Sequence, residues 1–137
     1  MSKLNTKSTI VDFMKQEGFE VKEQEDGNVL VISDEDGFII YSAITDAQIE
    51  FIVDICGVID LKPERLLEAY QTLLHKNTEI QPTCYGINDS EISNPRIVLV
   101  DSLPLEDLDE SELQLSLSSL AQNTVSSVEI LRPYLKG

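Results

Sequence analysis

The stretch FEVKEQEDGNVLVISDEDGFIIYSA, residues 19–43, decides the fold. Its first four residues alternate between apolar and polar side chains, which is typical of a half-buried β-strand. Two further runs rich in strand-forming residues follow, Val29 to Ile32 and Phe38 to Ala43. Acidic segments containing glycine join the runs: Asp26-Gly27-Asn28 and Asp34-Glu35-Asp36-Gly37. Because glycine and asparagine tolerate a positive φ, both segments suit tight turns. The stretch therefore predicts an antiparallel meander of three strands.

A short helix is expected before the meander. Ser8 or Thr9 can cap it, and Gly18 offers a left-handed stop. An apolar stripe is supplied by Ile10, Val11, Phe13 and Met14. At the other end of the chain, a long amphipathic helix is expected from about Ser111 to Leu131, with Pro133 as its stop. Its predicted apolar stripe comprises residues at spacings of three and four: Leu113, Leu117, Leu120, Thr124, Val128 and Leu131.

Residues 45–77 are predicted to be helical. Thr45 followed three residues later by Gln48 has the pattern of a capping box. Apolar residues continue on one helical face: Ile49, Ile52, Val53 and Cys56. A second helical stretch begins at Pro63, a residue favoured at the first helical position. It carries Leu66, Leu67, Tyr70, Leu73 and Leu74. Gly57 lies between the two stretches, so the region is either one broken helix or two separate helices.

Two later strands complete the pattern. The run Ile80 to Ile87 contains Pro82, which cannot donate to a sheet ladder and therefore predicts an edge position or a bulge. A polar loop, Asn88 to Pro95, leads to the strand Arg96 to Val100. The prediction is a single α+β domain over residues 1–137. Its antiparallel sheet has about five strands with helices packed on it, in the order α-β-β-β-α(α)-β-β-α.

The net charge of the chain disfavours several classes of ligand. The chain has 25 acidic and 10 basic residues among 137, a net charge of −15. Nucleic-acid binding depends on Lys and Arg that displace phosphate counterions, so DNA and RNA are disfavoured as ligands. Anionic membrane surfaces are disfavoured for the same reason. The acidity favours solubility and is compatible with a basic partner.

The sequence indicates a cytoplasmic protein. The first residues lack the apolar run of a signal peptide, and no segment has the roughly 18 apolar residues of a membrane span. Cys56 and Cys84 lie far apart in apolar surroundings, so we expect reduced thiols rather than a disulfide.

The search for catalytic and metal-binding motifs finds no strong candidate. His75 is the only histidine, which leaves a zinc site or a Ser-His-Asp triad little support. The turn that starts at Asp34 has its glycine at the fourth position and Thr45 at the twelfth, whereas a calcium-binding EF-hand needs glycine at the sixth and glutamate at the twelfth. We therefore expect no enzyme activity, no cofactor and no metal.

An acidic run precedes the last helix. It comprises Glu106, Asp107, Asp109, Glu110 and Glu112. Negative charge is favourable at a helix N-terminus, because the helix dipole is positive there. The alternative interpretation is a docking face for a basic partner.

The order of elements and the acidity resemble the class I type III secretion chaperones and their non-secretion relatives, the YbjN-like proteins and the uncharacterised YjfI-type bacterial family. The resemblance rests on the meander Phe19 to Ala43, the helix with Leu66-Leu67-Glu68-Ala69-Tyr70, the two later strands and the last helix. It spans nearly the whole chain, but in topology rather than in residue motifs. Gly57 and Pro63 depart from the chaperones, which have a single helix there.

The resemblance implies an acidic, dimeric, cytoplasmic protein that binds other polypeptides without catalysis. Chaperones of this fold hold an extended partner segment against apolar patches on the first helix and the sheet. By position, the residues of such a patch would be Ile10, Phe13, Met14, Phe19 and Val21, which also suit an ordinary core. Ser116 to Leu131 is the part of the chain that most resembles the YjfI-type family. This resemblance further implies a role beside phage-shock-like membrane-stress proteins.

The leading hypothesis is a non-enzymatic protein-binding or chaperone-like module of a bacterial cytoplasm, present as a homodimer. One alternative is an acidic regulatory or adaptor subunit, for example in a membrane-stress response. Another is a small enzyme or ligand-binding domain, which would require a deep pocket with buried acidic residues.

Overall fold

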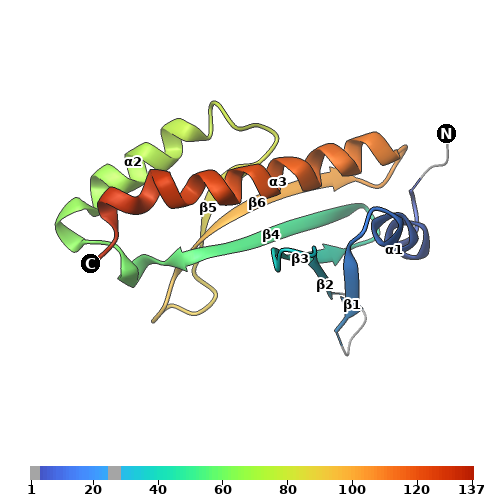
Figure 1. Cartoon of the computed structure of the whole chain (residues 1–137), viewed down its shortest axis with the longest axis horizontal. Coiled ribbons are helices and arrows are strands. Elements are labelled where there is room, and N and C mark those ends of the chain that lie inside the picture. The colour runs from blue at the N-terminus through green and yellow to red at the C-terminus, as the bar shows by residue number, and fades with distance from the viewer. Residues whose placement is uncertain (1–3, 25–28) are drawn as a thin grey trace. The chain divides into compact units, whose positions relative to one another are not determined.

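A computed structural model of the chain describes residues 4–24 and 29–137 (Figure 1). The helices and strands are α1 (Lys7–Gln16), β1 (Glu20–Glu23), β2 (Val29–Ser33), β3 (Ile39–Ile44), β4 (Gln48–Gly57), α2 (Leu66–Lys76), β5 (Cys84–Asn88), β6 (Arg96–Pro104) and α3 (Glu110–Leu131). Three short 3-10 turns are η1 (Val58–Asp60), η2 (Pro63–Arg65) and η3 (Arg132–Tyr134). The predicted α+β class is confirmed. The described strands form a sheet in the order β1-β2-β3-β4-β6-β5, which has six strands rather than about five.

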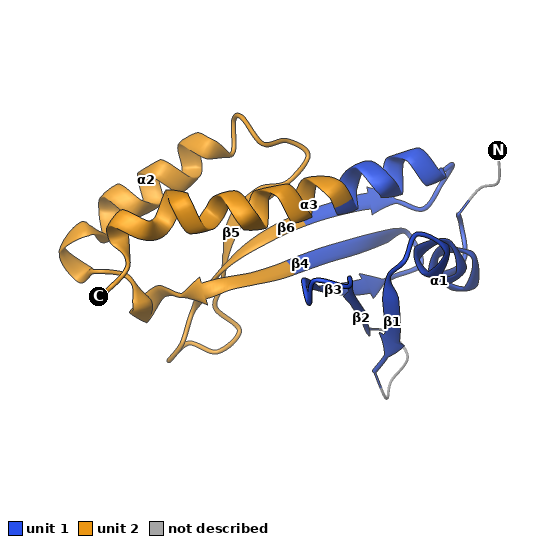
Figure 2. Ribbon diagram, in the orientation of Figure 1, with its two compact units in different colours: residues 1–52, 101–117 blue, residues 53–100, 118–137 orange. Residues whose placement is uncertain are grey.

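The chain divides into two compact units, coloured separately in Figure 2. Unit 1 comprises residues 1–52 and 101–117, and unit 2 comprises residues 53–100 and 118–137. Each unit takes part of β4, β6 and α3. The single domain expected from the sequence stays a prediction.

The predicted meander lies in unit 1 and is confirmed. β1 pairs antiparallel with β2, and β2 with β3. Alternate residues such as Leu30, Ile32 and Ile40 are buried, as expected for strands with one face in a core. The turn Asp34 to Gly37 is confirmed: Gly37 has a φ of 83°, and Asp34 Oδ1 accepts the Phe38 N–H at 2.9 Å. The turn predicted at residues 26–28 falls outside the described ranges.

The N-cap of helix α1 lies two or three residues before the predicted caps. Thr6 rather than Ser8 or Thr9 is the N-cap: its Oγ1 accepts the Thr9 N–H at 3.2 Å, and Thr9 Oγ1 accepts the Thr6 N–H at the same distance. This reciprocal pair is a capping box built from two threonines. Gly18, with a φ of 96°, ends the helix as predicted.

The helix predicted from Thr45 to Gly57 is wrong, because this segment is a turn followed by β4. Thr45 Oγ1 accepts the Gln48 N–H at 3.1 Å, as in a capping box, but the Thr45 N–H also donates to the Gln48 carbonyl at 2.9 Å and closes a tight hairpin. Ile49, Phe51 and Val53 are then buried on alternate positions. Residues 45–77 are therefore a strand followed by a helix, rather than one broken helix or two.

In unit 2, α2 follows the η2 turn, where Pro63 holds the first position as predicted. α2 lies against β5 and buries Ala69 and Leu73. β5 is shorter than predicted and begins after Pro82, and it stands at the end of the sheet, which confirms the predicted edge position. Arg96 donates to both carboxylate oxygens of Asp54, at 2.9 and 2.7 Å.

Helix α3 begins where the acidic run predicts a helix N-terminus. Asp109 Oδ1 accepts the Glu112 N–H at 2.8 Å, which is the role of an N-cap. The predicted stripe is buried at Leu113, Leu117, Leu120 and Leu131. Val128, which was predicted to belong to the stripe, is exposed.

Candidate functional site

The predicted partner-binding patch is placed mainly in the core of unit 1. Ile10, Phe13 and Met14 are buried, whereas Phe19 and Val21 are half-buried. An amphipathic stripe on a short helix predicts a buried face and a partner patch equally well. The patch stays a prediction, and its members nearest the surface are Phe19 and Val21.

A second apolar surface of unit 1 lies on the face of the meander opposite its buried side chains. We call it the outer face: Val29, Val31, Ile39, Tyr41, Ala43 and Ile52. In the antiparallel register, Val31, Tyr41 and Ile52 stand directly opposite one another across three strands. Ile39 is 45% exposed and Tyr41 41% exposed. The outer face therefore exposes Ile39 and Tyr41 to solvent, next to the half-buried Val29, Val31, Ala43 and Ile52.

Charged side chains border the outer face. Lys22 is the register partner of Val31, and Glu50 is the partner of Ala43. Lys22 Nζ lies 3.5 Å from an Oε of Glu20, and both side chains are exposed. An exposed ion pair of this kind contributes little to folding, so the border remains free to rearrange around a partner.

Unit 2 contains an apolar groove between α2 and β5. The α2–β5 groove is lined by Tyr70, Leu73, Leu74, Tyr85, Gly86 and Ile87, and its volume is about 310 Å³. Its lining contains no carboxylate. Leu74, 66% exposed, and Ile87, 51% exposed, border the opening. The exposed Leu67 extends the same face of α2, because residues seven apart lie on one side of a helix.

The sequence contained a signal for this groove that the prediction missed. The stripe assigned to α2 included Leu67 and Leu74 beside Leu66, Tyr70 and Leu73, which is wider than one buried face requires. Of these five residues only Leu73 is buried. The surplus apolar residues are those at the opening of the groove and above it.

Two polar features belong to Tyr85, which lines the α2–β5 groove. The hydroxyl of Tyr85 is buried without a hydrogen-bond partner among the described residues, and burial raises the pKa of Tyr85 to about 12. The main chain of Tyr85 pairs with the side chain of Asn77, just after α2. Asn77 Oδ1 accepts the Tyr85 N–H at 2.6 Å, and Asn77 Nδ2 donates to the Tyr85 carbonyl at 3.2 Å.

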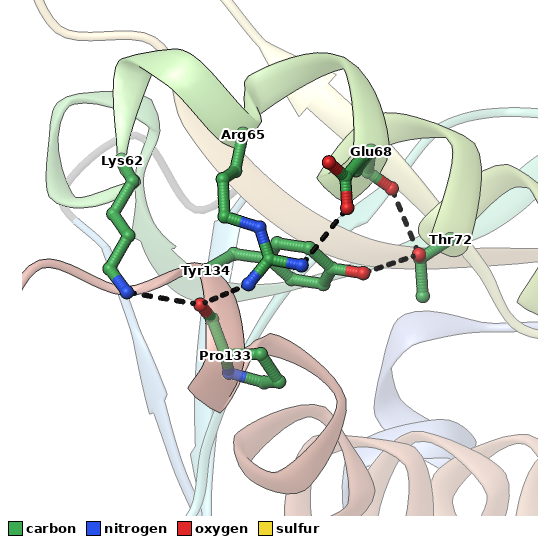
Figure 3. A network of polar contacts seen from close by, with 6 residues as sticks. All are labelled: Lys62, Arg65, Glu68, Thr72, Pro133 and Tyr134. Carbon is green, nitrogen blue, oxygen red and sulfur yellow. Dashed lines mark hydrogen bonds and ion pairs between the residues drawn. The ribbon is translucent and has the colours of Figure 1, made fainter.

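A polar network holds the C-terminal segment against the start of α2. Figure 3 shows its six residues: Lys62, Arg65, Glu68, Thr72, Pro133 and Tyr134. The Arg65 guanidinium stacks over the Tyr134 ring at 4.7 Å and donates to the Pro133 carbonyl at 3.1 Å and to Glu68 at 2.9 Å. The hydroxyls of Thr72 and Tyr134 share a hydrogen bond of 3.0 Å. Stacking and hydrogen bonds together fix the position of the helix that forms one wall of the groove.

One residue of the acidic run, Asp109, caps helix α3, whereas most of the others are exposed to solvent. Hydrogen bonds from the Glu112 N–H and the Ser111 hydroxyl hold the pKa of Asp109 below its usual value. Glu106, Asp107 and Glu112 are exposed, and Glu110 is half-buried. A docking role for this run stays a prediction.

The residues considered for chemistry are the two cysteines and the single histidine. Cys56 and Cys84 form no disulfide within the described residues, in agreement with the expected reduced thiols. Burial, together with nearby Asp60, raises the pKa of Cys56. Nε2 of the exposed His75 lies 3.3 Å from Oε1 of Glu79. Within residues 4–24 and 29–137, no three His, Cys, Asp or Glu side chains are grouped so that they could hold a metal ion. No helix in the described part of the chain is long and apolar enough to cross a membrane.

Comparison with known proteins identifies relatives of this architecture. The CesT_Tir_1 family model matches residues 3–135. The structure of YbjN from E. coli, a proposed transcription regulator, superposes with a TM-score of 0.71 at 12% identity, covering 98% of this chain and 99% of YbjN. An uncharacterised protein from Methanothermobacter thermautotrophicus gives a TM-score of 0.67 at 14% identity, covering 93% of this chain and 97% of that one. No functionally curated protein matches the sequence. At these identities the two structures support the fold alone.

Proposed function

Because this chain belongs to the CesT_Tir_1 family, a type III chaperone-like family, we propose that it is a non-enzymatic protein-binding module of the bacterial cytoplasm. Membership of a chaperone-like family suggests a protein-binding role. In our proposal, the module holds an extended apolar segment of a partner polypeptide on the outer face of unit 1.

The observation that carries the proposal is the exposure of Ile39 and Tyr41 within the row that includes Val31 and Ile52. β2 lies between β1 and β3, and β3 lies between β2 and β4, so the main-chain groups of both strands are used within the sheet. A partner would therefore be held through side chains. Contacts of this kind depend on apolar area and tolerate many sequences, which suits a chaperone-like role.

Capture of partners from the host of the protein tests the proposal. Tagged wild-type protein is compared with the double variant Ile39→Ser/Tyr41→Ser, and captured proteins are quantified by mass spectrometry. The matched control is Leu115→Ser/Val125→Ser, which removes two exposed apolar side chains from α3. We expect the outer-face variant to bind the captured partner about thirtyfold more weakly, because two lost contacts of roughly 1 kcal/mol each weaken binding by about 2 kcal/mol. Equal capture by both double variants would overturn the proposal.

We propose further that the protein is a homodimer. Light scattering coupled to size exclusion, with the protein at micromolar concentration, gives the mass directly. A monomer mass contradicts the dimer and leaves the role of the outer face untouched.

The acidic adaptor is the alternative function, favoured by the exposed Glu106, Asp107 and Glu112. Binding through this run would weaken steeply between low and high salt, because exposed charges are screened. Binding through the outer face would change little over the same range. The salt dependence of partner capture therefore separates the two functions.

A further inference from the structure

The outward edge of β5 has no neighbouring strand in the described sheet. β5 is the last strand in the sheet order and pairs antiparallel with β6. In an antiparallel pair, residues alternate between those that bond to the neighbouring strand and those whose main-chain groups point away from it. Tyr85 is of the second kind, because its N–H and carbonyl are bonded to Asn77. Ile87, two residues further, must then also direct its N–H and carbonyl away from β6.

The outward edge of β5 differs between Tyr85, whose main-chain groups are bonded to Asn77, and Ile87, whose main-chain groups are not. At Tyr85, the amide of Asn77 occupies the positions that an added strand would take. Side-chain blocking is one way in which proteins protect sheet edges. At Ile87, the main-chain groups face the open side of the strand beside the α2–β5 groove, which Ile87 itself lines. The open half of the edge therefore coincides with an apolar groove.

Charge indicates the partner that fits this edge. The loop that follows β5 carries the exposed Asp89 and Glu91 together with the exposed Ile92. A second copy that docked at this border would bring its own excess of acidic residues against Asp89 and Glu91, so pairing of two copies through this edge is disfavoured, whichever other surface joins the proposed homodimer. A segment with basic residues beside its apolar residues is complementary to it.

We propose that an extended segment of another protein, apolar at alternate positions and basic at its ends, adds to β5 at Ile87 and places an apolar side chain in the α2–β5 groove. The main-chain pair at Ile87 provides affinity and requires an extended conformation. The groove selects the side chain. Asn77 sets the register, since pairing cannot continue past Tyr85. The site lies in unit 2 and does not depend on the outer face.

The first test uses two synthetic peptides and the wild-type protein. One labelled peptide has Val and Leu at alternate positions and Lys at both ends. The other is identical except that its inward-facing amides are N-methylated, which removes the hydrogen-bond donors and keeps the side chains. We expect saturable binding of the first and binding at least about fivefold weaker for the second, which corresponds to the loss of one or two main-chain hydrogen bonds.

The second test uses variants at position 87. Ile87→Pro removes the outward N–H without removing a bond to β6, because proline is tolerated on the free side of an edge strand. Ile87→Ala is the matched control, since it shortens the side chain and keeps the N–H. We expect Ile87→Pro to bind the unmethylated peptide about fivefold to tenfold more weakly than Ile87→Ala. Circular dichroism and thermal melting verify that both variants are folded.

Three results would overturn the proposal. The first is an absence of saturable binding of either peptide. The second is equal affinity for the methylated and unmethylated peptides, which needs no variant and is unaffected by misfolding. The third is conversion of a dimer to a monomer by Ile87→Pro but not by Ile87→Ala, which would assign the edge to a second copy of the chain. Partner capture by the outer-face variants is a separate readout, so failure here is distinguishable from failure of the proposed function.

Discussion

The outer face of unit 1 and the α2–β5 groove of unit 2 both expose large apolar side chains, but on different parts of a sheet. The outer face lies on strands that have a neighbour on each side, so it offers side chains only. The groove adjoins a terminal strand, where main-chain groups of Ile87 point away from β6.

The difference separates two modes of recognition. A row of side chains such as Ile39 and Tyr41 holds an apolar segment with little demand on its direction or conformation. An edge demands an extended segment in a fixed register, because main-chain hydrogen bonds are directional. We infer that the first surface is permissive and the second selective.

The largest expected effect distinguishes the two faces of the meander. Ile40→Ala should lower the free energy of unfolding by about 2–5 kcal/mol, because Ile40 is fully buried and its truncation leaves a cavity. Ile39→Ala, one residue away on the outer face, should cost less than about 1 kcal/mol. Urea denaturation measures both. Equal losses would mean that the outer face is part of a core.

A buried and an exposed residue of the α2–β5 groove can be compared in the same way, with a slightly smaller expected difference in the free energy of unfolding. Leu73→Ala should lower the free energy of unfolding by about 2–4 kcal/mol, since Leu73 lies on the buried face of α2, whereas Leu74→Ala should cost less than about 1 kcal/mol. Chemical denaturation again gives the values. A large loss for Leu74→Ala would show that its side chain supports the fold rather than the opening of the groove.

Removal of the Asn77 side chain, which blocks the β5 edge at Tyr85, should lower the free energy of unfolding moderately. Asn77→Ala deletes two hydrogen bonds to the main chain of Tyr85 and should cost about 1–2 kcal/mol. Hydrogen exchange at the Tyr85 amide should accelerate by a similar free energy. Unchanged protection of that amide would refute the blocking role of Asn77.

The ionisation of Tyr85 has no effect on stability at neutral pH and is expected to matter only in alkaline solution. Burial raises the pKa of Tyr85 from 10.0 to about 12, so the protonated form is favoured in the folded protein. Its contribution to stability is fully present below pH 10 and is lost as the pH rises towards 12. The ultraviolet absorbance difference between wild type and Tyr85→Phe isolates this ionisation. A transition centred on pH 10 would contradict burial of the hydroxyl in the groove wall.

Local signals predicted the elements whose structure is determined locally. Turn residues at Asp34 to Gly37, the stop at Gly18 and the start at Pro63 act through neighbouring residues, and the structure confirms each. Thr45 and Gln48 were misleading, because the same side-chain bond to the third residue occurs at a helix start and in a hairpin turn. The alternation of Ile49, Phe51 and Val53 was the signal for β4.

The candidate surfaces were less accessible to sequence reasoning. Exposure of Tyr41 depends on a register that brings Val31 and Ile52 beside it, and register is a property of paired strands. The amide of Asn77 reaches Tyr85 only once α2 and β5 are packed. The edge position of β5 was predicted from Pro82, and it is correct although Pro82 lies just before the strand and takes no place in its ladder.

Photo-crosslinking inside the host cell shows directly whether a partner polypeptide lies on the outer face of unit 1. A photoreactive amino acid replaces Tyr41 on the outer face or, as the control, the exposed Val125 on α3. The account predicts adducts with a partner polypeptide from position 41, and few or none from position 125. Adducts from position 125 with none from position 41 would contradict a partner-binding role for the outer face.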